Sequence, residues 1–355
     1  MRVDIYSFFS GLGLLDLGFE KEGFHIEMVN EFNPQFLAAY KYGRNNKDNT
    51  PQYGYHNRDV RDFLNDDLWN KTTDFKRDRL VGFIGGPPCP DFSIAGKNSG
   101  VSGKNGQLTD VYMQLLLKRK PDFFVFENVK GLYTTRKHRE YYNYMKKTLD
   151  DAGYILSDKV LNALEYGVPQ FRDRLILVGF LKTSFKQCDF KLGSRKLYDL
   201  QYIQSMNWPK KLPFCEESII AKPRNIIKEL TPEYWFQKNK VYDHENALDV
   251  FNIVKRERFF DIWEGDVSRK SFKRLHRWRY SPTAAYGNNE VHLHPYKPRR
   301  LSVAETLAIQ SLPKDFTLPH NIPLTQKFKM IGNGVPFLLA KGIANEIKEF
   351  ILSHQ

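Results

Sequence analysis

The stretch Asp4-Ile-Tyr-Ser-Phe-Phe-Ser-Gly-Leu-Gly13 decides the fold class of this chain. Residues 4–9 form an apolar run typical of a buried strand, and the run stops at glycines before a helical pattern that continues to about Glu22. Glycine at such a turn lets a ligand approach the backbone closely, and the following helix presents free N–H groups at its start. The stretch therefore predicts a ligand-binding turn between a strand and a helix.

The same alternation of apolar runs and helical patterns extends to about residue 180 and returns near the end of the chain. We expect strands at residues 26–30, 81–84, 123–126 and 175–180, and helices at 34–42, 108–117, 303–310 and 336–350. Strands that alternate with helices predict an α/β, Rossmann-like domain with a mostly parallel sheet. Between these two parts, aromatic and basic residues are interleaved and strands do not alternate with helices, which indicates a smaller irregular domain. The expected limits are 1–180 for the first part of the α/β domain, 181–290 for the irregular domain and 291–355 for the return.

Composition restricts the class of partner. The chain has 355 residues, which at roughly 150 residues per domain suggests two domains. Lys and Arg number 54 against 41 Asp and Glu, and the net charge of +13 favours a polyanion such as nucleic acid, although a generally basic protein fits as well. Three cysteines argue against a disulfide framework and for a reducing cytoplasm. We expect no membrane helix, because no apolar stretch reaches about 18 residues, and no secretory signal.

Acidic residues follow the glycine turn at the spacing of a nucleotide site. Glu31 lies 20 residues after Gly11, at the end of the second expected strand, where a carboxylate commonly accepts hydrogen bonds from ribose hydroxyls. Asp59 is placed to close the adenine end of such a site. The pattern indicates a cofactor that contains adenosine, and it does not separate NAD from S-adenosylmethionine. A turn with a purely structural role is the alternative.

A cysteine between prolines follows the strand at residues 81–84. The two prolines in Gly85-Gly-Pro-Pro-Cys-Pro90 make this turn rigid, and strand ends of an open α/β sheet face the ligand crevice. We therefore interpret Cys89 as a candidate nucleophile, with an inert buried thiol as the alternative. The glycine- and serine-containing segment 90–106 has the composition of a mobile lid.

Two further groups of polar residues lie near strand ends. Glu127 ends the strand that begins at Phe123, and a carboxylate there is suited to act as an acid or to bind a ring nitrogen. Gln170, Arg172 and Arg174 precede the next strand and alternate onto one side. Two arginines on one side suit a phosphate or an electron-rich oxygen, and a solvated strand start is the alternative.

In this order, the segments resemble the DNA (cytosine-5) methyltransferases. The matching segments are Phe9–Gly13, Asn30–Phe32, Arg58–Val60, Gly86–Cys89, Glu127–Val129, Gln170–Arg174, Arg300–Glu305 and Gly332–Pro336. The chain also resembles the compact bacterial members that belong to restriction–modification systems, because it starts directly at the first motif. Phe32 stands where the family has an indole, and it keeps an aromatic face for stacking.

The resemblance implies a covalent mechanism on a cytosine flipped out of a DNA duplex. Cys89 would attack C6 of that cytosine, and Glu127 would contact N3. Arg174, supported by Arg172, would contact the ring oxygen or nearby backbone. C5 would take the methyl group of S-adenosylmethionine, which leaves S-adenosyl-L-homocysteine as the product.

The resemblance also assigns the residues that hold this cofactor. They are Phe9, Gly11, Leu12, Gly13, Glu31, Phe32, Asp59, Val60, Pro88, Leu108, Asn333 and Val335. Residues from both ends of the chain are in this set, so the final helix is expected to lie beside the first motif.

The irregular domain corresponds to the target-recognition domain of the family. Within residues 271–279, Lys273, Arg274 and Arg277 are the expected DNA contacts, since Arg pairs well with guanine edges and Lys with phosphates. Ser93, Lys97 and Gln170 are expected to contact DNA as well, and a basic solvated face is the alternative. His292 and His294 lack a third ligand, so we expect no metal.

The expected partner is double-stranded DNA, shared with a cognate restriction endonuclease that forms no stable complex. We expect a monomer in the bacterial cytoplasm at the nucleoid. The alternatives are a transfer RNA cytosine-5 methyltransferase and a catalytically inactive DNA-binding protein. An NAD-dependent oxidoreductase explains only the glycine turn and leaves Cys89 and Glu127 without a role.

Overall fold

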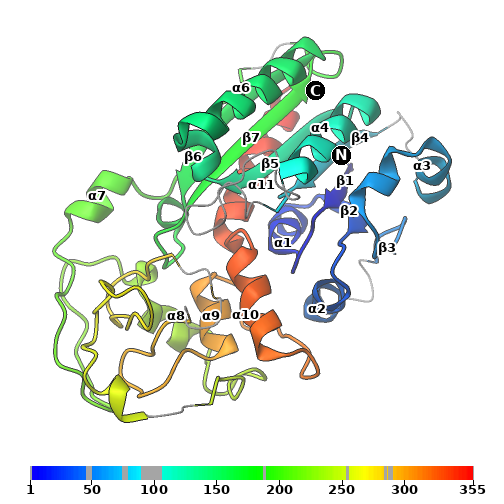
Figure 1. The fold of residues 1–355 in the computed structure, drawn as a ribbon. Coiled ribbons are helices and arrows are strands. Elements are labelled where there is room, and N and C mark those ends of the chain that lie inside the picture. Colours follow the sequence, from blue (N-terminus) through cyan, green and yellow to red (C-terminus); the bar gives the residue numbers. More distant parts are fainter. Residues whose placement is uncertain are drawn as a thin grey trace.

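A computed structural model describes residues 2–44, 50–73, 79–88, 106–186, 189–252, 256–283, 286 and 291–354. Within these ranges a seven-stranded sheet with the order β3-β2-β1-β4-β5-β7-β6 forms the centre of the larger lobe (Figure 1). The strands are β1 (Val3–Phe8), β2 (His25–Asn30), β3 (Tyr55–His56), β4 (Leu80–Gly85), β5 (Phe123–Val129), β6 (Tyr154–Asn162) and β7 (Asp173–Leu181). No helix of the described ranges combines the length and the apolar character needed to cross a membrane.

The strand directions bring several strand ends to one edge of the sheet. β1 to β5 pair in parallel, so their carboxyl ends meet at the same edge. β7 pairs antiparallel with both β5 and β6, and Val129 at the end of β5 lies opposite Arg174 at the start of β7. The start of β7 therefore lies at the edge where the parallel strands end.

Helices cover both faces of the sheet, which accounts for the fully buried β1. One face carries α1 (Leu14–Lys21), α2 (Pro34–Arg44) and α11 (Phe337–Ser353), and the other carries α3 (Asp66–Thr72), α4 (Gly106–Arg119), α5 (Gly131–Thr134) and α6 (Arg136–Asp151). α6 shows why these segments form surface helices: it buries only His138, Tyr142, Met145 and Leu149, which recur at helical spacing along one stripe.

The smaller lobe is mostly irregular. Its helices are α7 (Leu200–Ser205), α8 (Pro232–Lys238), α9 (Val303–Ile309) and α10 (Leu324–Asn333). Trp235, Leu275 and Phe328 share an apolar cluster with Leu14 of α1 and Phe36 of α2, so this core continues from the smaller lobe to the larger one. The domain limits given above stay a prediction, since this cluster runs across them.

The expected α/β class with a mostly parallel sheet is confirmed, and each expected strand lies within a few residues of an observed one. β6 was not expected from the sequence. It is an edge strand whose central residues, Ser157, Asp158 and Lys159, are partly or fully exposed, so its apolar signal is weak. α10 and the long α6 were also missed.

Candidate active site

The glycine turn after β1 is held by a carboxylate from the end of β2. Gly11 and Gly13 adopt positive φ angles of 56° and 76°, which glycine tolerates and other residues rarely do. Glu31 accepts hydrogen bonds from the N–H groups of Gly11 (2.8 Å) and Asn33 (2.7 Å). Phe9 also has a positive φ, 53°, and such backbone outliers gather at ligand sites.

Several features of this turn fit an adenosine-containing group with a charged amino-acid tail. The Ser10 hydroxyl oxygen is buried without a hydrogen-bond partner among the described residues, so it has capacity for a ligand. A Cβ atom built on Gly11 would meet nothing within 4 Å, which leaves room against the backbone. Burial raises the pKa of Glu31, while its bonds to the two N–H groups oppose that rise. Phe32 is 72% exposed and offers an aromatic face beside Glu31.

The other expected cofactor residues lie around this turn. Phe9, Val60 and Leu108 pack against one apolar cluster, and Asp59 caps the 3-10 segment η2 (Val60–Leu64) by accepting from the Arg61 N–H. Leu12 is buried and Pro88 is half-buried after β4. Asn333 is exposed at the end of α10 and Val335 is buried. A Cβ at Gly334, between these two, would lie 2.4 Å from Leu14, so the C-terminal segment touches the start of α1.

A second polar cluster lies at the same sheet edge, where β4 and β5 end and β7 begins. Glu127 is 8% exposed, and its Oε1 lies 2.7 Å from Nε of Arg174. A Cβ at Gly86 would lie 2.7 Å from the other carboxylate oxygen, so a side chain at this position would displace the carboxylate. Burial raises the pKa of Glu127, and the charges of Arg174 and Arg172 counteract the rise. The cluster thus holds a carboxyl group suited to exchange a proton or a hydrogen bond with a ring nitrogen.

The Arg172 side chain binds the backbone of the C-terminal segment. It is 1% exposed, and its Nη2 donates to the backbone oxygens of Gly332 (2.5 Å) and Gly334 (3.0 Å). Burial and the like charge of Arg174 lower its pKa. Its described hydrogen bonds therefore hold the C-terminal segment, next to the Glu127–Arg174 pair.

Three of the expected site residues cannot be placed. Cys89, Ser93 and Lys97 lie outside the described residues, as does the expected lid segment up to residue 105. The described chain stops at Pro88, two residues after Gly86, so Cys89 follows directly on the loop that contacts Glu127.

The structure corrects the expected DNA contacts of two arginines. The Arg274 side chain is fully buried and donates to the backbone oxygens of Ile262 (2.7 Å), Lys297 (3.1 Å), Phe259 and His294. Arg277 is buried against Glu264 (Nη2 to Oε2, 2.7 Å). Both guanidinium groups are thus used inside the smaller lobe, where they cannot reach a base edge. The sequence pattern of basic residues did not reveal the internal carbonyl and carboxylate partners.

Gln170 needs the same correction. Its side chain is fully buried, and the amide nitrogen of Gln310 lies 3.4 Å from its Oε1. Its backbone pairs with Ser281, which places it at the junction of the two lobes. Lys273 is half-buried, and its contact with DNA stays a prediction.

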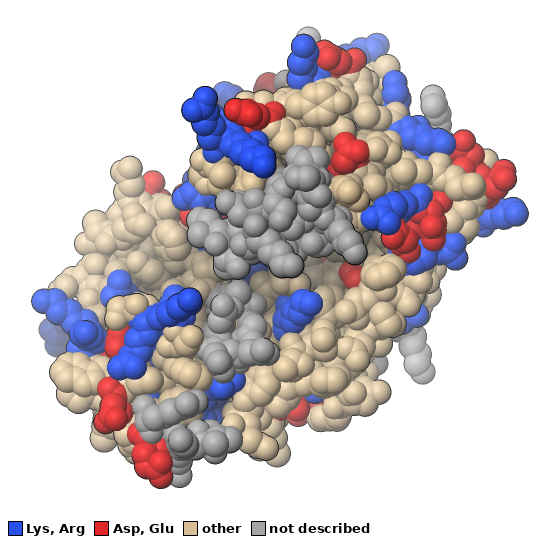
Figure 2. All heavy atoms as spheres, in the orientation of Figure 1, with Lys and Arg blue, Asp and Glu red and all other residues tan. Residues whose placement is uncertain are grey.

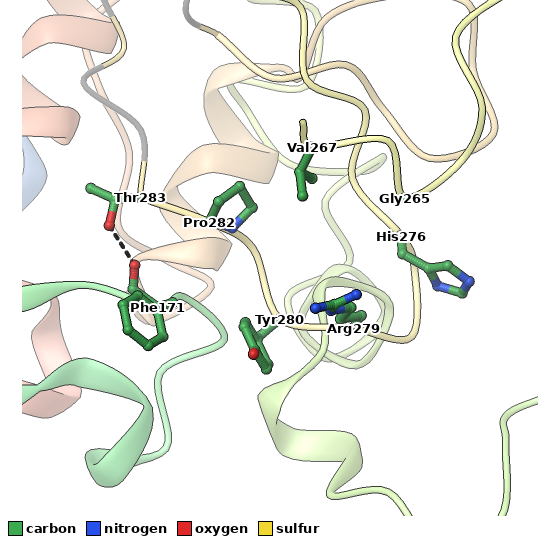
Figure 3. Close-up of a pocket in the computed structure, with 8 residues that line it drawn as sticks. All are labelled: Phe171, Gly265, Val267, His276, Arg279, Tyr280, Pro282 and Thr283. Atoms are coloured by element: carbon green, nitrogen blue, oxygen red, sulfur yellow. Dashed lines mark hydrogen bonds between the residues drawn. The ribbon is translucent and has the colours of Figure 1, made fainter. Parts of the chain in front are cut away.

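A cavity of about 190 Å³ lies beside this junction (Figure 3). It is lined by Phe171, Gly265, Val267, His276, Arg279, Tyr280, Pro282 and Thr283. The segment 280–283 is tied to the segment before β7, because Phe171 N–H donates to Ser281 oxygen (2.8 Å) and the Thr283 hydroxyl donates to Phe171 oxygen. The Arg279 guanidinium lies over the Tyr280 ring and has no ion-pair partner in the described part of the chain.

Sequence reasoning missed some residues of the site. Ser10 lies inside the quoted glycine turn. Its position between a strand end and a glycine was the sequence signal that could have marked its hydroxyl as a ligand contact. Gly86 was recognised as part of a rigid loop, whereas its contact with Glu127 depends on the packing of β4 against β5. Arg279 was not among the predicted DNA contacts, whereas its neighbours Arg274 and Arg277, which the fold buries, were.

Comparison with known proteins identifies the family. The model of the C-5 cytosine-specific DNA methylases matches residues 3–349. Type II methyltransferase M.NmeDI of Neisseria meningitidis serogroup C is 52% identical to this chain, over 99% of the chain and 84% of that protein. Type II methyltransferase M.FnuDI of Fusobacterium nucleatum is 31% identical, over 97% of the chain and 94% of that protein.

Solved structures share the fold. A protein encoded within an E. coli prophage superposes with a TM-score of 0.69 at 22% identity, over 99% of both chains. The S. pombe Dnmt2 methyltransferase superposes with a TM-score of 0.63 at 13% identity, again over 99% of both chains. The family match spans nearly the whole sequence and includes both polar clusters of the sheet edge, so this chain belongs to the C-5 cytosine-specific DNA methylases and is a DNA cytosine-5 methyltransferase.

Proposed function

We propose that this enzyme methylates C5 of a cytosine flipped out of a short, specific sequence in double-stranded DNA, through a covalent adduct with Cys89. S-adenosylmethionine would be the methyl donor, held at the glycine turn. The modification would protect host DNA from a restriction endonuclease that recognises the same site, since the similar proteins are named Type II methyltransferases. The enzyme would act as a monomer in the cytoplasm.

The observation that carries this proposal is the buried Glu127–Arg174 pair at the sheet edge, beside the glycine turn. Both partners are at most about one-tenth exposed, with 2.7 Å between Nε and Oε1. A carboxyl group and a guanidinium that lie side by side present an acid or acceptor and a donor to one edge of a planar ring. Those are complementary to the N3 and O2 positions of cytosine.

The residues of this chain divide the chemistry between them. Attack of the Cys89 thiolate on C6 forms the Sγ–C6 bond and moves electron density to C5, the carbon to be methylated. Glu127 shares a proton with N3 and Arg174 donates to O2, so the negative charge that develops on the ring is stabilised. Once C5 carries the methyl group, its proton passes to a solvent water, and the electrons of that C–H bond re-form the C5–C6 double bond as the Cys89 thiolate leaves. S-adenosylmethionine, when bound, supplies an electrophilic methyl group on a sulfonium centre.

The DNA would lie between the two lobes. On the face shown in Figure 2, both lobes carry Lys and Arg side chains, which are interspersed with Asp and Glu side chains. We assign phosphate contact to Lys273 and base contact to Arg279, because Arg279 lines the cavity beside the Phe171 backbone and has no internal ion-pair partner in the described chain. Arginine binds guanine through O6 and N7 in the major groove.

Transfer of labelled methyl groups to unmethylated plasmid DNA, followed by base-resolution mapping of 5-methylcytosine, tests the proposal. We expect label in one short recurrent sequence. The Cys89→Ala variant should lose turnover but still bind S-adenosyl-L-homocysteine and the plasmid. The Arg279→Ala variant should label additional sites that differ at one position. Turnover by Cys89→Ala at the wild-type rate would refute the covalent route, and an unchanged map for Arg279→Ala would refute the base contact.

A further inference from the structure

The side chain of Arg172 connects two parts of the molecule that are far apart in sequence. It comes from the residue just before β7, and it is one of the largest fully buried side chains in the described structure. Its Nη2 donates to the backbone oxygens of Gly332 and Gly334, on either side of Asn333. A buried guanidinium that holds two carbonyl groups sets the position of that backbone.

Arg172 also lies two residues before Arg174, the arginine that pairs with Glu127. Its charge acts on Glu127 and on Arg174, and these are the two members of the ion pair proposed to hold the cytosine ring. Tyr286 is the other titratable group that interacts with Arg172. A shift of Arg172 would therefore change the electrostatic field at the Glu127 carboxyl group.

The backbone that Arg172 holds is in turn pressed against the glycine turn. A Cβ at Gly334 would overlap the Leu14 side chain, at 2.4 Å from Cδ1, and Leu14 directly follows Gly13. Asn333 and Val335, the C-terminal residues assigned to the cofactor, flank the same glycine. Contacts thus run from the glycine turn through Gly334 to Arg172, and the charge of Arg172 in turn acts on Glu127.

We infer that Arg172 is a positioning residue that couples the cofactor site to the target-base pocket, so that each ligand changes the affinity for the other. The inference rests on the proposed function of both sites. A cofactor that binds Asn333 and Val335 would hold the two carbonyl groups in place, and these groups fix the guanidinium whose charge acts on the Glu127–Arg174 pair. Coupling of this kind is reciprocal in binding free energy.

The test measures the affinity of the full-length enzyme for S-adenosyl-L-homocysteine by calorimetry, with and without a saturating duplex that contains the mapped methylation site. For the wild type we expect the two dissociation constants to differ by about fivefold or more. The Arg172→Lys variant keeps the charge but cannot hold two carbonyl groups with one planar fork, so the ratio should fall towards one. The Gly334→Ala variant disturbs the same contacts from the other end and should also reduce the ratio.

Arg44→Lys is the matched control. Arg44 is another buried arginine that donates to a backbone oxygen, that of Gly13 (2.6 Å), and it pairs with Glu20 on the cofactor side. This variant should bind S-adenosyl-L-homocysteine more weakly by the same factor with and without duplex. A wild-type ratio of one, or an unchanged ratio in folded Arg172→Lys and Gly334→Ala, would overturn the inference. Absence of plasmid methylation by the wild type would instead overturn the proposed function.

Discussion

At the scale of single residues, the environment of Glu127 determines what its carboxyl group can do. The group is buried beside Arg174, and it lies so close to Gly86 that a side chain at position 86 would displace the carboxylate. Burial favours the protonated form, and the neighbouring guanidinium favours the ionised form. A carboxyl group balanced in this way is suited to share a proton with a base nitrogen.

The Glu127→Gln variant should lose most of the methyl-transfer activity. The amide retains the shape of the side chain, but it cannot transfer a proton to N3 or form an ion pair with Arg174. General acid–base groups contribute about 10²–10⁴-fold to turnover, and we expect kcat to fall within that range. Single-turnover transfer to plasmid DNA measures the loss.

Glu22→Gln is the control for that experiment. Glu22 follows the last turn of α1, where it lies near Lys341 and Lys348 of α11, and it has no contact with the sheet-edge clusters. Its substitution should leave kcat unchanged. If Glu127→Gln turned over as fast as Glu22→Gln, the role assigned to Glu127 would be wrong.

At the scale of elements, the contact between α1 and α11 places the glycine turn against the C-terminal segment. The two helices approach so closely at Gly18 that a Cβ there would lie 2.6 Å from the backbone carbon of Ala340. α11 buries Leu339, Ala340, Ile343 and Ile347 in the core of the sheet. The last helix of the chain thus supports the first one, whose start forms the cofactor turn.

The Gly18→Ala variant should therefore destabilise the protein and weaken cofactor binding together. Overpacking of a tight contact costs about 1–3 kcal/mol, which thermal unfolding will show as a lower midpoint. Lys341→Ala, on α11, removes only the surface ion pair with Glu22, which contributes about 0–1 kcal/mol. A midpoint for Gly18→Ala equal to that of Lys341→Ala would show that the helices can separate without cost.

At the scale of the whole molecule, buried histidines make stability depend on pH. Burial lowers the pKa of several histidines below the ordinary value of 6.5, and that of His292 to about 3. In the described chain they are His56, His138, His244, His276, His292 and His294. Below pH 6.5 the unfolded chain binds protons that the folded protein does not, so stability falls as the pH is lowered from 6.5 towards 3.

We expect the free energy of unfolding, measured with urea, to be lower at pH 5 than at pH 7. Each histidine that stays neutral in the folded state contributes up to about 1.4 kcal/mol per pH unit below 6.5. His292→Asn should reduce this slope, whereas substitution of His25, exposed at the start of β2, should leave it unchanged. Equal stability at the two pH values would contradict the expectation.

The sequence by itself determined the local features of this protein. The run from Asp4 to Gly13 was sufficient to predict a strand, a glycine turn and a helix, because each depends on neighbours within a few residues. Strand ends of an open α/β sheet face the ligand crevice, so the strand-end positions of Glu31 and Glu127 were enough to make each of them a candidate site residue. Family resemblance then supplied the reaction.

Only the tertiary structure decided how the arginines are used. Arg172, Arg274 and Arg277 each bind a partner on another segment of the chain, and the partners of Arg172 are 160 and 162 residues away. A guanidinium has the same appearance in the sequence whether it meets a base, a carboxylate or a backbone oxygen. Which one it meets depends on the packing of distant segments, and no periodicity along the chain records that packing.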